Sequence, residues 1–236
     1  MGTVASIAVD PRPGGEEAAS AAVAAACREL HRVDERYSTW SADSLLSRFR
    51  RGEATPDEEL AGVLEHCREL RELTGGWFDP WAARGGVDPT GMVKGWAAQR
   101  ACAILAAADV ASGSVNAGGD VATTGAPPDG WRWGLRHPWR PDALAGVVAL
   151  PPGGAVATSG TYERGQHLWN PFDGGPARAK SATVCGPSLT VADALATALA
   201  VAGAPLLDRI EALDSYEAWV VSPEGDEAST SGFPWA

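Results

Sequence analysis

The sequence of 236 residues contains few sulfur-containing or imidazole side chains: four cysteines, two methionines and four histidines. The cysteines are widely spaced and form no Cys-x-x-Cys pair, and the scattered histidines add no zinc-ligand spacing. No serine lies in a Gly-x-Ser-x-Gly segment, which argues against a Ser-His-Asp hydrolase. We therefore expect the cysteines to be small core residues in a reducing compartment: Cys27, Cys67, Cys102 and Cys185.

Basic charge and long apolar runs are also scarce. The 19 Lys and Arg side chains stand against 30 Asp and Glu side chains, and the net charge of −11 argues against a nucleic-acid partner. No apolar run approaches the length of a membrane span, and the first residues lack a basic region followed by an apolar one. We expect a soluble, cytoplasmic chain without a membrane span. Such an acidic chain would bind a phosphate ligand locally, with backbone N–H groups, a metal and a few cations.

The hydrophobic periodicities predict a mixed α and β chain, long enough for one large domain or two small ones. We expect helices over residues 16–36, 56–74, 92–108, 190–202 and 206–213, with Thr55 and Thr190 as N-caps of the second and fourth. The strands between residues 131 and 185 follow one another without helices, which indicates an antiparallel sheet. The last dozen residues resemble a loose tail. In 114–121 we expect a strand that runs into a tight Gly-Gly turn. The other strands are expected at 3–9, 131–136, 147–150, 155–159, 181–185 and 218–221.

The first candidate site lies in residues 187–198, which read PSLTVADALATA. Asp193 and Thr197 are four residues apart in the expected helix, so their oxygens lie on one face, one turn apart. One carboxylate and one hydroxyl in this arrangement suit a hard cation such as Mg²⁺. The alternative is that Asp193 complements the helix dipole and Thr197 is a small packing residue.

A second candidate site is the Gly- and Pro-rich segment 75–95, GGWFDPWAARGGVDPTGMVKG, which leads into a helix. Unpaired N–H groups at such a helix start bind phosphate well, and Lys94 in the first turn would meet the anion; a structural turn is the alternative. The segment is not a Walker A loop, and SVNAGGDV at 114–121 is not the GxGxxG of a Rossmann fold. His167 lies in an expected loop, where a lone histidine is usually solvated or hydrogen-bonded and takes no part in chemistry.

Eight segments follow one another along the chain: MGTVASI, STWSADSLLSRF, GGWFDP, VDPTGMVKG, VNAGGD, ATSGTYER, HLWNP and LTVADALATAL. Taken together and in this order, they resemble the ApbE family, the FAD:protein FMN transferases. The chain departs from the family pattern in a shorter connection between FDP and VDPTG, and at Asn170, Gln99 and Arg50, where the family usually has Asp, an acidic residue and Asn. The metal-site residues are intact, so these departures concern the surroundings of the site and substrate choice.

The resemblance implies one α+β, T-fold-like domain over residues 1–236, with an antiparallel sheet core flanked by helices. It implies a phosphoryl-type transfer, in which the FMN part of FAD passes to a Thr or Ser hydroxyl of an acceptor flavoprotein and AMP leaves. Mg²⁺ would be held by Asp193, Thr197 and the carbonyl of Gly91, and His167 would be the general base. The FAD-binding residues would be Met1, Trp40 as a stacking ring, Phe78, Asp79, Pro80, Asp88, Lys94, Gly118, Gly119, Asp120, Thr158, Ser159 and Gly160.

Two other activities fit many of the same residues. A Mg²⁺-dependent FAD pyrophosphatase would use water in place of the protein hydroxyl, and the sequence does not separate these two acceptors. A non-catalytic flavin-binding protein is disfavoured, because Asp193, Thr197 and His167 are all present and a protein that only binds flavin has no need of the base.

Overall fold

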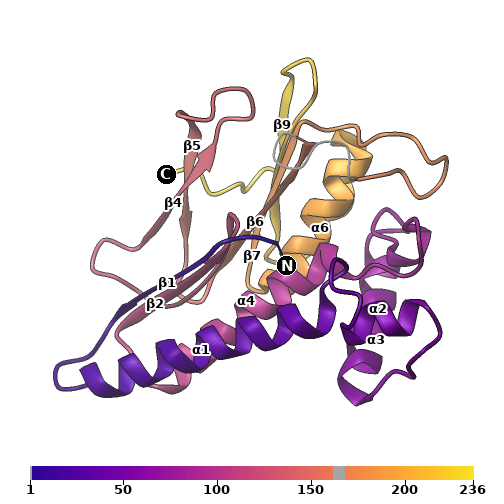
Figure 1. Cartoon of the computed structure of the whole chain (residues 1–236). Helices are drawn as coiled ribbons and strands as arrows, with labels where there is room; N and C mark the ends of the chain where they lie inside the picture. The colour runs from indigo at the N-terminus through magenta and orange to yellow at the C-terminus, as the bar shows by residue number, and fades with distance from the viewer. Residues whose placement is uncertain (1, 162–167) are drawn as a thin grey trace.

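A computed structural model describes residues 2–161 and 168–236, in which strands and helices alternate in groups along the chain (Figure 1). The helices are α1 (Glu16–Tyr37), α2 (Leu45–Arg50), α3 (Glu58–Leu73), α4 (Thr90–Ala107), α6 (Leu189–Ala202) and α7 (Leu207–Glu211), with 3₁₀ turns η1 (Pro80–Ala82) and η2 (Ala204–Leu206). The strands are β1 (Ala5–Asp10), β2 (Ser112–Ala117), β3 (Asp120–Gly125), β4 (Trp131–Arg136), β5 (Leu144–Leu150), β6 (Ala155–Gly160), β7 (Ser181–Gly186), β8 (Glu217–Val221) and β9 (Glu227–Ser229).

A seven-stranded antiparallel sheet, in the order β1-β2-β3-β6-β7-β8-β9, organises the fold. Helices α1, α4 and α6 lie on one side of this sheet, and the hairpin β4–β5 lies on the other side with the C-terminus (Figure 1). The expected antiparallel sheet flanked by helices is thus confirmed. One detail of the expectation is wrong, because β4 and β5 pair with each other as a separate hairpin instead of joining the sheet. No helix within the described ranges is both long and apolar enough to cross a bilayer.

The sheet is apolar on both faces, as the alternation along β8 shows. Ala218 and Val220 belong to the core on the helix side, whereas Trp219 and Val221 belong to a second core under the hairpin. On the helix side, α6 packs against β6, β7 and α4, and almost every one of its residues is buried. A helix that is buried all round is apolar all round, so a carboxylate such as Asp193 within it is costly unless it has partners.

Two helices begin at other residues than expected. Helix α3 is capped by Asp57, whose carboxylate accepts from the Leu60 N–H at 3.0 Å, so Thr55 is not the cap. Helix α6 is capped by Ser188, whose hydroxyl accepts from the Val191 N–H, and Thr190 lies within the first turn. In both segments neighbouring Ser, Thr and Asp residues offer the same capping oxygen, and sequence alone does not rank them.

The structure also orders segments that sequence patterns did not resolve. Helix α2 forms within the mixed segment after Trp40. Residues 112–125 form the hairpin β2–β3, with the expected Gly-Gly turn at its tip and a second strand, β3, that was not expected. The C-terminal residues are not a loose tail, because Phe233 is buried in the second core and the Ala236 N–H donates to the Val147 carbonyl at 2.9 Å. Of the cysteines, three are buried as expected, but Cys27 is exposed.

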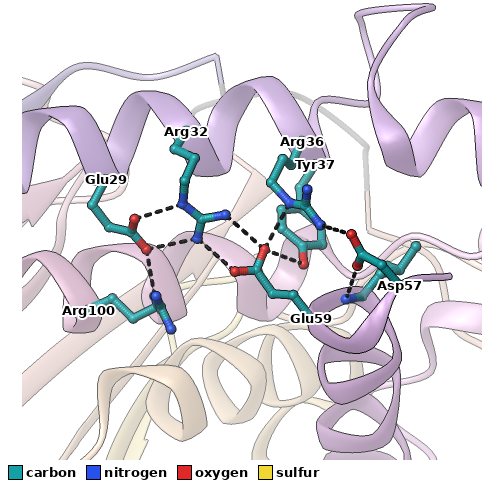
Figure 2. A network of polar contacts seen from close by, with 8 residues as sticks. Glu29, Arg32, Arg36, Tyr37, Asp57, Glu59 and Arg100 are labelled. Carbon is teal, nitrogen blue, oxygen red and sulfur yellow. Dashed lines mark hydrogen bonds and ion pairs between the residues drawn. The ribbon is translucent and has the colours of Figure 1, made fainter.

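A network of charged side chains fastens α1 to α3 and α4 (Figure 2). Arg32 lies at its centre and donates to Glu29 on its own helix and to both carboxylate oxygens of Glu59 on α3. Arg100 of α4 donates to Glu29 at 2.6 Å. The hydrogen bonds from Arg32, and next those from Arg100, lower the pKa of Glu29 from 4.5 to about 2, although burial opposes the shift.

This network predicts acid-sensitive stability. A carboxyl whose pKa is lowered in the folded state stabilises the protein at every pH above its unfolded-state pKa, here 4.5. This contribution is lost as the pH falls toward the folded-state pKa of about 2. We expect Glu29→Gln to lose about 1 to 3 kcal/mol of unfolding free energy at pH 7, with a deficit that shrinks below pH 4. Urea unfolding between pH 7 and pH 3 measures it. Glu35→Gln, on the exposed side of the same helix, is the control, and a Glu29→Gln deficit that stays constant with pH would contradict the assignment.

Candidate functional site

A cleft of about 410 Å³ opens beside the start of α4 and along one side of α6, from Asp193 to Val201. This volume is within the range of small-molecule sites. The lining combines aromatic rings with carboxylates, hydroxyls and one lysine, which suits a ligand with both flat and anionic parts. The lining residues are Thr39, Trp40, Trp77, Phe78, Asp79, Pro80, Ala82, Ala83, Asp88, Thr90, Gly91, Lys94, Thr158, Ser159, Gly160, Leu168, Trp169, Pro171, Asp193, Thr197 and Val201.

Asp193 is the most constrained side chain of the cleft. Its residue surface is 2% exposed, and its Oδ2 accepts a hydrogen bond from the Gly95 N–H of α4 at 2.8 Å. Burial is the main reason why its pKa lies well above the ordinary value, and the nearby Asp120 carboxylate adds to the shift, whereas Lys94 opposes it. A buried carboxyl that lines an open cleft and lies beside a second carboxylate favours the binding of a cation.

Two further oxygens lie beside Asp193 along the cleft. The hydroxyl of Thr197, one turn along α6, donates to the Gly91 carbonyl at 3.4 Å and lies 3.3 Å from the Ser159 hydroxyl. Gly91 has little room for a side chain, because a Cβ atom there would be 3.1 Å from the Phe78 ring and 3.2 Å from the Thr197 hydroxyl. The absence of a side chain therefore lets the first turn of α4 approach α6, and the carboxylate, hydroxyl and carbonyl gather at one place.

Lys94 and Asp120 form an ion pair behind this group of oxygens. Lys94 projects from α4 to Asp120, which begins β3 and is fully buried. The other carboxylate oxygen of Asp120 accepts from the Thr158 N–H of β6 at 3.0 Å. The pair thus joins α4 to two neighbouring strands and places positive charge at the edge of the cleft, because Lys94 is also a lining residue.

The carboxylates on the opposite part of the lining are held by local contacts. Asp79 caps η1 through the Trp81 N–H at 2.9 Å and pairs with Arg71 at 2.7 Å. Asp88 accepts from the Thr90 N–H at 3.0 Å, at the start of α4. These bonds fix the two carboxylates in position, and three of the residues between them also line the cleft: Pro80, Ala82 and Ala83.

Gln99 connects α4 to the start of α6. Its side-chain oxygen accepts from the Ser188 hydroxyl at 2.9 Å, from the Thr190 N–H at 3.0 Å and from the Thr190 hydroxyl at 3.1 Å. An amide oxygen thus does what a carboxylate in this position would do, since only an acceptor is needed. The start of the helix that carries Asp193 is therefore fixed by a neutral residue.

This contact gives a prediction with a built-in control. Gln99→Met removes the acceptor and leaves three donors without it, so we expect it to lower the unfolding free energy by about 1 to 3 kcal/mol. Gln99→Glu retains the acceptor and adds negative charge at a helix N-terminus, so we expect stability equal to or above that of the unaltered chain. Urea unfolding at pH 7 compares the two. Equal losses in both variants would mean that the amide N–H₂, and not the oxygen, is the important group.

The structure brings together most residues that the sequence singled out. Twelve of them line the one cleft: Trp40, Phe78, Asp79, Pro80, Asp88, Gly91, Lys94, Thr158, Ser159, Gly160, Asp193 and Thr197. Asp120 lies behind it through Lys94, and Gly118 and Gly119 form the turn between β2 and β3, outside the described lining. Met1 and His167 fall outside the described residues.

Sequence reasoning missed several aromatic and small lining residues. Trp77 and Trp169 lie in the segments GGWFDP and HLWNP, which were quoted for their family resemblance without a role for either ring. Clusters of aromatic residues beside Gly and Pro in an expected loop were the available signal. Among the described residues, no group of three or more His, Cys, Asp and Glu side chains is placed to hold a metal. A cation here would therefore depend on hydroxyl and carbonyl oxygens as well as on Asp193.

Comparison with known proteins gives a consistent assignment. The ApbE family model matches residues 1–85 and 82–220 of this chain. An FAD:protein FMN transferase of Rhodobacter capsulatus is 36% identical over 138 residues, which cover 53% of this chain and only 26% of that protein. Among solved structures, the flavin transferase ApbE of Vibrio cholerae has a TM-score of 0.81 at 22% identity and covers 99% of this chain and 95% of its own. The ApbE protein of Thermotoga maritima has a TM-score of 0.78 at 24% identity, with 90% and 89% covered. The two solved structures establish a shared fold.

Proposed function

This chain belongs to the ApbE family, and we propose that it transfers the FMN part of FAD to a Thr or Ser hydroxyl of an acceptor protein, with AMP as the leaving group. In this reaction the acceptor oxygen forms a bond to the FMN-side phosphorus, and the pyrophosphate bond to AMP breaks. The observation that carries the proposal is the gathering of Asp193, Thr197 and the Gly91 carbonyl in one cleft with aromatic walls. We propose that residues 1–236 act in it as a single domain.

The donor set of the cleft fits Mg²⁺. The three oxygens are of the kinds that this hard cation prefers, and Asp193 is buried next to Asp120, so that a cation offsets the cost of ionising both. Asp193, Thr197 and the Gly91 carbonyl would hold the ion. Bound there, Mg²⁺ would supply a Lewis acid that neutralises charge on the pyrophosphate.

The remaining residues of the chain bind and orient FAD in this proposal. Lys94 meets the pyrophosphate from the second turn of α4, because the helix begins at Thr90 rather than at Met92 as expected, and the helix start one turn away also favours an anion. Trp40, which is 89% exposed at the edge of the cleft, is free to stack on a flavin or adenine ring. Phe78 and Pro80 supply apolar wall on the other side, and Asp88 contacts the dinucleotide beside α4.

His167 is proposed as the general base that takes the proton of the acceptor hydroxyl. We expect His167→Ala to bind FAD and Mg²⁺ normally and to transfer FMN at least about a hundredfold more slowly. The rate of the unaltered chain should fall as the pH drops below about 6.5, since only neutral imidazole accepts a proton. Transfer rates of both chains, measured from pH 5 to pH 8, test the two rate predictions. Flavin fluorescence tests whether FAD binding by the variant is normal. Normal transfer by the variant would remove His167 from the mechanism.

One experiment separates the proposed reaction from its alternatives. The chain is incubated with FAD, Mg²⁺ and a flavinylation-competent acceptor, and AMP and acceptor-bound flavin are both measured. AMP in equal amount to an FMN mass adduct on the acceptor supports transfer, and loss of both in EDTA supports the metal. AMP and free FMN without an adduct would instead indicate a pyrophosphatase. FAD binding without AMP would indicate a binding protein.

A further inference from the structure

The loop between η1 and α4 has little internal support. Residues 83–89 include Gly85 and Gly86, both with positive φ, and the bond from the Asp88 N–H to the Pro80 carbonyl at 2.9 Å closes the loop near its end. Ala82 and Ala83, where the loop begins, line the cleft. A glycine-containing loop of this kind opens readily unless other residues bind its backbone.

Arg50 supplies such support from another element. Its guanidinium, at the end of α2, donates from Nε to the Gly85 carbonyl at 3.0 Å and from an η nitrogen to the Arg84 carbonyl at 3.3 Å. The stem of the same side chain lies against Gly86, where a Cβ atom would be 3.5 Å from Cγ of Arg50. One planar, fork-shaped group thus holds two successive carbonyls of a loop that is more than thirty positions away in the chain.

The side chain of Arg84 carries this connection to the cleft. Its guanidinium lies over the Trp169 ring, 4.3 Å from the centroid, and Trp169 lines the cleft. Trp169 is itself fixed, because its backbone bridges to Pro176 and the next residue, Asn170, donates its N–H to the Gly175 carbonyl at 2.8 Å. Two contacts therefore hold the loop at Arg84: Arg50 binds the backbone carbonyl of Arg84, and Trp169 packs against the Arg84 side chain.

We propose that Arg50 is a positioning residue for the dinucleotide: it holds residues 83–86 in the conformation in which Arg84 stacks on Trp169 and completes one side of the cleft. The inference rests on the proposed function for the identity of the ligand. The two hydrogen bonds from Arg50 to the loop, which we call the brace, are a property of the free chain. Because the guanidinium donors of Arg50 are directed to backbone carbonyls, it acts through the shape of the loop and not as a charge for the phosphates.

Limited proteolysis tests the brace without any ligand. Trypsin cleaves after Arg84, and the rate of appearance of the fragment that ends there reports how often the loop opens. We expect Arg50→Met, which keeps an apolar stem but has no donors, to raise this rate at least about fivefold. Arg50→Lys, with one donor group in place of the fork, should give an intermediate increase. Arg48→Ala, which removes a cation from the exposed side of the same helix, should leave the rate unchanged.

Steady-state kinetics with FAD test the consequence for binding. We expect Arg50→Met to raise the KM for FAD by about tenfold with kcat changed by less than about threefold, and Arg48→Ala to change neither. Arg84→Met should raise KM as well, and the double variant should show less than the product of the two effects, because both act on one wall.

Several outcomes would overturn the inference. Proteolysis of Arg50→Met at the rate of the unaltered chain would show that Arg50 does not brace the loop. If Arg50→Lys had an unaltered KM while Arg48→Ala weakened binding as much as Arg50→Met, simple charge would explain the effect. An unaltered chain that does not turn over FAD would contradict the proposed function, whereas the proteolysis would still decide whether the brace exists.

Discussion

Asp193→Asn is expected to slow FMN transfer by at least about a thousandfold while the fold stays intact. Asn has nearly the same shape, and its amide oxygen still accepts from the Gly95 N–H, so the contact between α4 and α6 survives. What it loses is the negative charge that a cation requires. In the ligand-free chain, removal of a buried charge beside Asp120 should leave Tm unchanged or higher.

The measurement for Asp193→Asn combines function and stability. AMP release is followed over a range of Mg²⁺ concentrations, Mg²⁺ binding by calorimetry, and Tm by scanning calorimetry. Asp208→Asn, which removes an exposed carboxylate on α7, is the matched control and should leave all three unchanged. Turnover close to that of the unaltered chain would show that Asp193 holds no metal. A large drop in Tm would mean that its charge is structural.

Gly95→Ala is expected to impair both folding and activity, although Ala is the better helix former. A Cβ atom at this position would be 2.6 Å from the Leu189 carbonyl oxygen and 2.8 Å from Cβ of Asp193. These are backbone and near-backbone atoms that cannot rotate away, so α4 and α6 must move apart. We expect a loss of about 2 to 3 kcal/mol of unfolding free energy. Because the displaced atoms belong to Asp193 and its helix, residual activity should fall well beyond what the remaining folded fraction explains.

Gly62→Ala is the matched control for Gly95→Ala. Gly62 is an exposed residue in the middle of α3, and a Cβ atom there would have no atom within 4 Å. We expect this variant to be more stable by about 0.5 to 1 kcal/mol, the gain that Ala gives over Gly in an open helix. Urea unfolding of both variants therefore should give changes of opposite sign. A stabilised Gly95→Ala chain would show that the two helices are not in close contact.

Much of the local structure could be predicted from the sequence, because it depends on neighbouring residues. The expected long helices formed, and six of the seven expected strands formed with nearly the expected bounds. The exception was the 112–125 region, where the first strand and the Gly-Gly turn were expected but β3 was not, because its small residues show no strong alternation. The end of the chain was misjudged for a related reason. Its few apolar residues lack a period, yet Phe233 and Trp235 pack on strands that are distant in sequence.

The candidate site likewise depends partly on local spacing in the sequence and partly on tertiary packing. The sequence by itself determined that Asp193 and Thr197 share one face of a helix, because the α-helical period depends only on spacing. Only the tertiary structure decided that this face meets the Gly91 carbonyl, that Gly95 must lack a side chain, and that Arg50 holds the loop at Arg84. These contacts join segments from 34 to 106 positions apart. Their existence depends on how α4 packs on α6 and where α2 ends, and packing of this kind leaves no periodic signal in the sequence.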